Sequence, residues 1–367
     1  MTAPLVLGAG PAGCAAAIVL AEAGAAPTLL DRDTEVADAL CGGFLSWRTA
    51  ARLGSLGIDP ATLGAHRVHT LALFAGRRTA AFALPAPGYG LSRRVLDTEL
   101  RTRALGAGAT LAIDTARGIE GDTVIGRKRD WRGDGLFLAA GKHDVRGHLR
   151  PRTARDPAVG LRLRLPPDAA RQRLLGGRIE LHLFAGGYAG IVVQEGGAAN
   201  VCLAVRKSRL AGDPAELLAR LADENPALGE RLGDDWRGVR CETIGAVPYG
   251  YLARETAAGL FRVGDQAAVI PSLAGEGIAI ALTSGALAAR AWLTGGPAAA
   301  PAFQRAFAAL AQGPVRTAAL AWHLAENRAL ARFGVALAGH VPPVVGWLMR
   351  ATRLDAAGSL APVPSAS

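Results

Sequence analysis

The fold is decided by residues 3–31, which read APLVLGAGPAGCAAAIVLAEAGAAPTLLD. The apolar segment at 3–7 predicts a buried strand, and the alanine-rich run at 14–24 predicts a helix. A second apolar segment, 27–30, predicts another strand and leads directly to Asp31. Strand, glycine turn, helix, strand and acid follow in the order that a dinucleotide-binding βαβ unit requires.

Each glycine of this turn has a separate physical task. Gly8 permits a tight turn after the strand, and Gly10 has no Cβ, so backbone can approach a pyrophosphate there. Gly13 allows the helix to pack closely on the sheet. We expect Pro11 and Ala12 to contact the cofactor too, because a helix N-terminus presents unpaired N–H groups and a positive dipole end to phosphate.

The acid that ends the second strand completes this expected site. Asp31 lies where a carboxylate accepts hydrogen bonds from a ribose diol, and we include the adjacent Arg32 in the site. A glycine-rich turn in some other α/β unit is the competing explanation. We consider it the weaker one, because every part of the βαβ unit is present.

Composition and charge limit the class of protein. The chain has 367 residues, of which 50% are hydrophobic and 20% charged, so it can form two globular domains. We recognise no signal peptide and no uncharged apolar stretch of about twenty residues. The four cysteines lack metal-ligand spacing, so we expect no metal site and a reduced, cytoplasmic protein.

The net charge of +10 is concentrated in residues 127–155. Few aromatic residues accompany these basic side chains, so we favour a solvated face and expect no nucleic-acid partner. A basic face also suits an anionic membrane or an acidic cosubstrate such as NADPH. Contact with a membrane surface therefore stays open as an alternative.

A second constellation occupies residues 260–292. A buried strand leads to a Gly-Asp pair, a Pro- and Gly-containing loop follows, and an alanine-rich helix runs from 278 to 292. The Asp carboxylate can accept hydrogen bonds from ligand hydroxyls, and the helix N-terminus favours the negative charge of a reduced flavin. The expected cofactor residues here are Gly264, Asp265, Gly275, Gly277 and Ile278.

The middle of the chain has the alternation of an antiparallel sheet, for example at 159–165 and 178–184. Such a sheet can keep one face open to a ligand. His182 and Tyr188 are candidate catalytic residues that could line a pocket there, although we favour the alternative that they are ordinary sheet residues. Cys41, beside Gly42, either contacts the cofactor or substrate or is an inert packed residue.

The glycine turn, Arg93 within Ser92–Asp97, and the segment 264–277 occur together in one known superfamily. Over about residues 1–300 the chain resembles the FAD-dependent aromatic hydroxylases of the p-hydroxybenzoate hydroxylase type and the geranylgeranyl reductases. The resemblance implies FAD, with the glycine turn at the pyrophosphate and Asp31 at the adenosine ribose. It also implies Arg93 near the pyrophosphate or ribityl chain and Asp265 on the ribityl chain.

Other segments indicate which branch of this superfamily the chain resembles. Cys41-Gly42-Gly43 resembles the reductases, in which this segment lies beside the flavin. Gly190 stands where the reductase motif Tyr-x-Trp-x-Phe-Pro has its Trp, and residues 139–144 lack the Asp of the hydroxylases' Ala-Asp-Gly motif. The Trp-x-Trp-x-Ile-Pro motif of flavin halogenases is absent from the sequence.

We therefore predict an FAD-dependent oxidoreductase and rank hydroxylation of an apolar, electron-rich substrate, aromatic or polyketide-like, slightly first. The alternatives are a geranylgeranyl-reductase-like C=C reductase or dehydrogenase and a non-catalytic flavin-binding protein. NAD(P)H is the expected reductant. Because the sequence has no second glycine motif for a nicotinamide domain, transient binding or an electron-donor partner also stays open.

The expected architecture is α/β: a Rossmann-like FAD-binding domain of the glutathione reductase type, an antiparallel-sheet substrate domain and C-terminal helices. The FAD-binding domain is expected to be discontinuous. The predicted boundaries are 1–68, 90–155 and 250–300 for FAD binding, 69–89 and 156–249 for the substrate sheet, 301–355 for the helices and 356–367 for a disordered tail.

Overall fold

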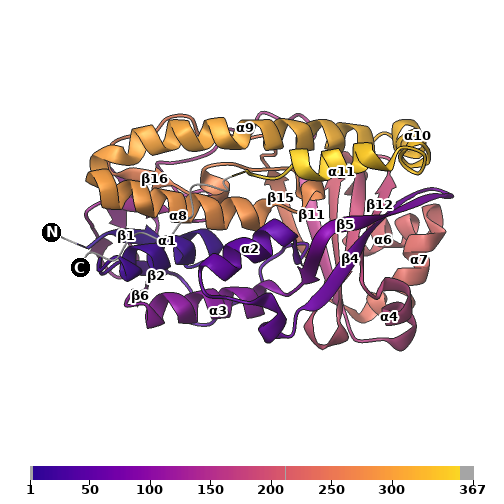
Figure 1. Cartoon of the computed structure of the whole chain (residues 1–367), viewed down its shortest axis with the longest axis horizontal. Coiled ribbons are helices and arrows are strands. Elements are labelled where there is room, and N and C mark those ends of the chain that lie inside the picture. The colour runs from indigo at the N-terminus through magenta and orange to yellow at the C-terminus, as the bar shows by residue number, and fades with distance from the viewer. Residues whose placement is uncertain (1–2, 211, 356–367) are drawn as a thin grey trace.

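The computed structural model describes residues 3–210 and 212–355. A five-stranded parallel sheet, at the left in Figure 1, has the strand order β16-β10-β1-β2-β6. Its strands are β1 (Leu5–Leu7), β2 (Thr28–Asp31), β6 (Thr110–Ile113), β10 (Leu136–Leu138) and β16 (Leu260–Arg262). This Rossmann-like sheet confirms the predicted α/β class and places the glycine turn at the carboxyl end of its central strand.

Two helices of small residues pack on this sheet. Nearly all of α1 (Pro11–Glu22) is buried, and its alanines and Gly13 let it lie against α8 (Gly277–Gly295). A Cβ on Gly285 would collide with the carbonyl oxygen of Ala12, so the two helices need glycine at this contact. Cys14 is fully buried, as expected, and burial raises the pKa of its thiol.

The second sheet has eight strands in the order β15-β11-β14-β13-β12-β4-β5-β3. Its strands are β3 (Phe44–Leu45), β4 (His66–Ala75), β5 (Arg78–Gly90), β11 (Ala158–Leu165), β12 (Arg178–Phe184), β13 (Gly187–Val193), β14 (Ala199–Arg206) and β15 (Glu242–Val247). The expectation of a purely antiparallel sheet is wrong, because β12 runs parallel to β4. Between β5 and β11 the chain passes through the parallel sheet. No hairpin therefore joins β4 to β12, and these two strands are free to pair in parallel.

Two prolines, Pro85 and Pro87, lie inside β5. β5 continues through both prolines to Gly90, with a register shift against β4 between Val68 and Thr70. On its other side β5 pairs with β3 only at Tyr89 and Gly90. The prolines are tolerated because the ladder is irregular or unpaired where their missing N–H groups lie.

Two serine side chains cap helices. Ser46 accepts the N–H of Thr49 at the start of α2 (Trp47–Ser55), and Ser92 accepts the N–H of Val95 at the start of α3 (Arg93–Gly106). A small sheet of β7 (Gly118–Glu120), β8 (Thr123–Ile125) and β9 (Asp130–Trp131) carries part of the basic segment.

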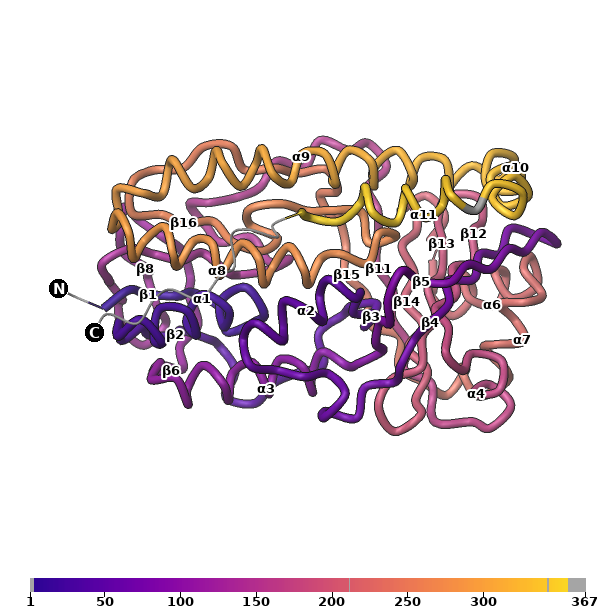
Figure 2. The backbone as a smooth tube through the Cα atoms, viewed as in Figure 1, coloured from indigo at the N-terminus to yellow at the C-terminus, as the bar shows by residue number. Residues whose placement is uncertain are grey.

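The two faces of the eight-stranded sheet are covered by different helices. One face packs against α4 (Ala169–Leu175), α6 (Pro214–Glu224) and α7 (Pro226–Leu232), at the right end in Figure 1; the short α5 (Lys207–Leu210) follows β14. The other face looks toward α9 (Ala300–Ala325), α10 (Arg328–Ala338) and α11 (Pro342–Ala351). Figure 2 shows α9 running from the parallel sheet to the eight-stranded sheet, so this helix joins the two sheets.

The continuous helical segment 277–325, which comprises α8 and α9, is long and apolar enough to cross a membrane. However, 61% of its most apolar window is buried inside the protein, which is typical of a core helix. The predicted domain boundaries stay a prediction, and the predicted disordered tail lies outside the described residues.

Candidate functional site

The three glycines of the first turn are required for three different reasons. Gly8 has φ +107°, and a Cβ there would lie 2.5 Å from the carbonyl oxygen of Ala139 at the end of β10. A Cβ on Gly13 would collide with the carbonyl oxygen of Gly8. Gly10 faces open space, since the nearest group to its would-be Cβ is Nη2 of Arg93 at 3.7 Å. This space next to a helix N-terminus is a cradle for a phosphate group.

Asp31 holds the same turn from the end of β2. Its Oδ2 accepts the N–H of Ala9 at 2.6 Å, and its Oδ1 accepts the N–H of Asp33 at 3.1 Å. Its carboxylate is thereby fixed beside the turn, where the predicted ribose contact requires it. The exposed Arg32 pairs with Asp33 at 2.9 Å, so its predicted cofactor contact stays a prediction.

Arg93 is positioned by its own helix. Its guanidinium makes a two-point contact with Asp97, at 2.8 Å and 2.6 Å. Burial opposes the charge on Arg93, but the Asp97 carboxylate outweighs this effect and raises the pKa of Arg93. A fixed positive charge therefore lies next to Gly10, where a pyrophosphate would need it.

The loop after β16 is held by α8 and by the loop after β10. The N–H of Gly264 donates to Ser284 Oγ at 2.7 Å, and Arg150 Nη1 donates to the carbonyl oxygen of Asp265 at 3.0 Å. Arg150 is itself held by Asp144 at 2.7 Å. Sequence reasoning missed Arg150 because its partner, Asp265, lies 115 residues away in the chain. It missed Asp144 because this residue lies in an irregular loop.

The segment around Cys41 closes the cofactor side of the site. Asn200 Nδ2 on β14 donates to the carbonyl oxygens of Cys41 and Gly42, at 3.0 Å and 2.8 Å. No atom lies within 4 Å of a Cβ built on Gly42 or on Gly277, so both glycines border open space. The glycines, Arg93 and Asp265 thus border one continuous space that suits an extended dinucleotide with a flat ring.

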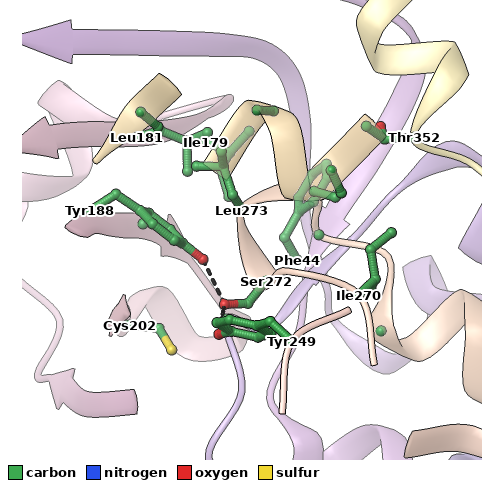
Figure 3. A pocket seen from close by; sticks show the side chains of 18 of the residues that line it. Phe44, Ile179, Leu181, Tyr188, Cys202, Tyr249, Ile270, Ser272, Leu273 and Thr352 are labelled. Carbon is green, nitrogen blue, oxygen red and sulfur yellow. Dashed lines mark hydrogen bonds between the residues drawn. The ribbon is translucent and has the colours of Figure 1, made fainter. Parts of the chain in front are cut away.

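One cavity of about 610 Å³ includes this space and extends from it toward the C-terminal helices. Figure 3 shows Phe44, Ile179, Leu181 and Leu273 directed into it. Its aliphatic lining comes from β4, β5, β12 and β15 of the eight-stranded sheet and from α9, α10 and α11. The members that these elements contribute include Leu71, Leu73, Leu84, Leu183, Val247, Ala321, Leu324, Leu330, Val335, Leu337, Val345, Leu348 and Met349.

Three hydroxyl groups meet in the cavity wall (Figure 3). Tyr188 on β13 donates to Ser272 Oγ at 2.9 Å, and the Tyr249 hydroxyl lies 2.6 Å from the same atom. Trp322 of α9 packs against both tyrosine rings, with centroid distances of 5.8 Å. Burial raises the pKa of Tyr249 to about 12 and raises the pKa of Tyr188 well above its usual value. We call Tyr188, Ser272 and Tyr249 the hydroxyl cluster.

Two of the three predicted catalytic candidates, Cys41 and Tyr188, line this cavity, but His182 does not. His182 faces the opposite side of the sheet, where its ring stacks on Phe74 at 4.5 Å and its Nε2 lies 3.0 Å from Glu180. Arg231 of α7 completes this buried group. We therefore drop His182 as a catalytic candidate, because strand alternation directs it away from the cavity.

A buried ion pair that the sequence analysis missed lies where α8 begins. Glu276 is 1% exposed, and its Oε1 lies 3.3 Å from Nε of Arg353, the second residue after α11. Burial raises the pKa of Glu276 despite the nearby arginines. The pair anchors the end of α11 to the helix that starts beside the expected flavin site. The only sequence signal is a Glu inside the Gly-rich loop 275–277.

Comparison with known proteins gives these features a context. Residues 1–106 match the family model described as FAD binding domain. Digeranylgeranylglycerophospholipid reductase 2 of Methanopyrus kandleri is 30% identical over 311 residues, which cover 77% of this chain and 75% of that protein. Reductase 1 of the same organism is also 30% identical, over 312 residues that cover 77% of this chain and 78% of that protein.

Solved structures share the fold over almost the whole chain. A flavin-dependent brominase has a TM-score of 0.72 at 14% identity and covers 98% of this chain and 95% of its own. A geranylgeranyl bacteriochlorophyll reductase-like protein from Thermoplasma acidophilum has a TM-score of 0.68 at 19% identity and covers 98% and 94%. The chain therefore belongs to the family of FAD-dependent oxidoreductases that includes the digeranylgeranylglycerophospholipid reductases.

Proposed function

We propose that this FAD-dependent oxidoreductase reduces carbon–carbon double bonds in a long, apolar, isoprenoid-like substrate. The observation that carries the proposal is the aliphatic cavity, which runs from the flavin-facing glycines to α10 and α11. The two archaeal reductases at 30% identity support it. This choice reverses the order of preference drawn from the sequence, in which hydroxylation of an electron-rich ring came slightly first.

The lining of the cavity favours a chain over a polar ring. Of the four charged residues in the lining, Arg93, Lys142 and Asp265 lie at the cofactor end, next to the glycine turns, and Arg353 is paired with Glu276 at the start of α8. The opposite end has aliphatic side chains from α9, α10 and α11. Burying each CH₂ of a substrate chain there contributes about 0.8 kcal/mol, so a polyprenyl group can bind without charged anchors.

Gly275 and Gly277 would lie beside the ring of a bound FAD, which in its reduced form would supply the hydride for one carbon of the double bond. The other carbon takes a proton, and we assign this proton to the hydroxyl cluster. Tyr188 donates to Ser272 Oγ, so the Ser272 proton can be directed to Tyr249 Oη, which leaves the Tyr249 proton free for the cavity. The raised pKa values keep both phenols protonated at neutral pH.

For the reductant we propose NAD(P)H that binds transiently, with an electron-donor protein as the alternative. The sequence contains one glycine motif of the dinucleotide-binding type, which the FAD-binding region uses. Cytoplasmic localisation and the lack of a nucleic-acid partner also stay predictions.

An anaerobic mixing experiment tests the proposed reaction. The purified holoenzyme is reduced with dithionite without oxygen and mixed with geranylgeraniol, while the flavin absorbance is followed. We expect the absorbance of oxidised flavin to return in the absence of oxygen, and we expect no return with the fully saturated C20 alcohol. A flavin that stays reduced with geranylgeraniol until oxygen is admitted would instead support hydroxylation.

A further inference from the structure

The last helices expose large apolar side chains to solvent. Phe333 on α10 is 67% exposed and Trp347 on α11 is 59% exposed. Eight of the ten exposed large hydrophobic residues in the described part of the chain lie between 320 and 347. These eight form the apolar patch: Leu320, Leu324, Leu330, Phe333, Leu337, Val341, Val344 and Trp347. So many exposed apolar side chains on neighbouring helices mark an interaction surface.

The patch belongs to helices that are already held in place by their other faces. Val335 of α10 packs on Ala75 of β4, and Val345 of α11 packs on Phe82 of β5. Arg353 is anchored to Glu276. The inner faces therefore position the helices, and the outer faces stay available for a partner (Figure 1).

The apolar patch is also the mouth of the cavity. Five of its eight residues line the cavity while being exposed to solvent: Leu324, Leu330, Leu337, Val341 and Val344. An apolar molecule that enters from this patch would therefore pass along aliphatic side chains all the way to the hydroxyl cluster.

The charge around the patch is positive. Residues 320–355, which include the patch, contain four arginines and two acids; Glu326 is paired with Arg206 and Asp355 with Arg48. Arg328, Arg332 and Arg350 of this segment are exposed. Basic side chains next to an apolar surface attract anionic lipid headgroups, and Trp is favoured at the boundary between water and lipid. Two copies that met through this face would bring like charges together, which disfavours a second copy as the occupant.

We propose that the apolar patch docks on a phospholipid bilayer that contains anionic lipids, with the cavity mouth facing the membrane. Residues 328–338 and 343–351 are together apolar enough for a membrane segment, but a sharp bend separates them. This geometry suits helices that lie in the interfacial layer rather than a straight span. The inference goes beyond the proposed reaction and concerns binding alone, so it is tested without turnover.

Vesicle sedimentation of the FAD-loaded, full-length protein tests the inference. We expect the protein to sediment with vesicles of phosphatidylcholine and phosphatidylglycerol, and more weakly with phosphatidylcholine alone or at high salt. Combining Phe333→Ser with Trp347→Ser should lower the partition coefficient at least about tenfold. The matched control is Leu149→Ser, because Leu149 is 71% exposed but lies outside the patch; it should bind like wild type.

A second measurement keeps the inference falsifiable if the double variant folds poorly. Brominated lipids should quench part of the tryptophan fluorescence of the wild type, and Trp347→Phe should bind normally but lose that part of the quenching. Absence of sedimentation with both kinds of vesicle would overturn the proposal. So would undiminished binding of a folded double variant, or light scattering that shows a dimer which the double variant converts to a monomer.

Discussion

The hydroxyl oxygen of Tyr249 lies 2.6 Å from the hydroxyl oxygen of Ser272. Tyr249 follows β15 of the eight-stranded sheet, whereas Ser272 begins the turn that leads to Gly275 and α8. The contact therefore joins the wall of the substrate cavity to the segment expected beside the flavin. It places a protonated phenol between the two, which is where the proposed reduction of a double bond would need its proton donor.

Removing this phenol hydroxyl should slow the chemical step and spare the cofactor. We expect Tyr249→Phe to lower the rate of flavin oxidation by geranylgeraniol about a hundredfold, because the ring stays and only the proton source is lost. FAD content and melting temperature should stay at the wild-type values. The matched control is Tyr251→Phe, since Tyr251 does not line the cavity. Equal rates in both variants would remove Tyr249 from the mechanism.

A side chain on the second glycine of the turn should prevent cofactor retention. Gly10 borders open space beside Arg93, and Gly10→Val would fill the position of the pyrophosphate. We expect the purified variant to contain less than about a tenth of the wild-type FAD while its far-ultraviolet circular dichroism is unchanged. Gly313→Val, on α9 with open space around it, is the control. A yellow, saturated Gly10→Val protein would contradict the assignment.

The carboxylate after β16 should contribute to affinity for the cofactor. Asp265→Ala removes an acceptor for ligand hydroxyls, while Arg150 still binds the backbone carbonyl of residue 265. We expect the dissociation constant for FAD to rise about tenfold to a hundredfold, as for a lost hydrogen bond to a charged group. Titration of the apoprotein with FAD measures this change, and an unchanged constant would exclude Asp265 from the site.

Filling the cavity should select against long substrates. A Cβ on Gly190 would lie 3.5 Å from Leu181 Cδ2, so Gly190→Ala fits the wall and serves as the control. Gly190→Trp would place an indole in the path of a long chain. We expect flavin oxidation by geranylgeraniol to slow at least about tenfold, with a smaller effect for geraniol and unchanged FAD content. Equal slowing for both alcohols would argue against a chain-length effect.

One carboxylate outside the site predicts a pH dependence of stability. Asp114 accepts hydrogen bonds from the Trp131 indole N–H and from backbone N–H groups, including those of Arg127 and Lys128. These donors, Trp131 foremost, hold the pKa of Asp114 well below its ordinary value. A carboxylate with a lowered pKa in the folded state stabilises above its unfolded pKa of about 4, and this contribution is lost as the pH falls.

Melting temperatures of Asp114→Asn and wild type should therefore differ by a few degrees at pH 7 and converge as the pH falls below about 4. The control is Asp223→Asn on α6, whose side chain is exposed, and its curve should follow the wild type at every pH. A gap between Asp114→Asn and wild type that stays constant down to about pH 2 would show that the ionised carboxylate is not the cause.

The cofactor turn was predictable because its determinants are local. The order of strand, Gly8, Gly10, Gly13 and Asp31 is set within thirty-one residues, and the structure gives each of the three glycines the geometry that the sequence suggested. The caps at Ser46 and Ser92 were predictable for the same reason.

The substrate side was harder to predict because its contacts join distant segments. Alternation along β12 places Glu180, His182 and Phe184 on one face, but it does not say which face looks into the cavity. The hydroxyl cluster needs residues 188, 249 and 272 from three separate elements. Glu276 and Arg353 likewise come from distant segments of the chain. Such pairs follow from the tertiary fold, which the local patterns do not encode.

The mass of the product distinguishes reduction of a double bond from hydroxylation. The dithionite-reduced holoenzyme is incubated with geranylgeraniol, first without oxygen and then under ¹⁸O₂, and the alcohol is analysed by mass spectrometry. If the enzyme reduces double bonds, the product gains two hydrogen atoms in the anaerobic sample and contains no ¹⁸O in either sample. A substrate that is unchanged without oxygen and that acquires ¹⁸O under ¹⁸O₂ would contradict the proposed reduction and identify a monooxygenase.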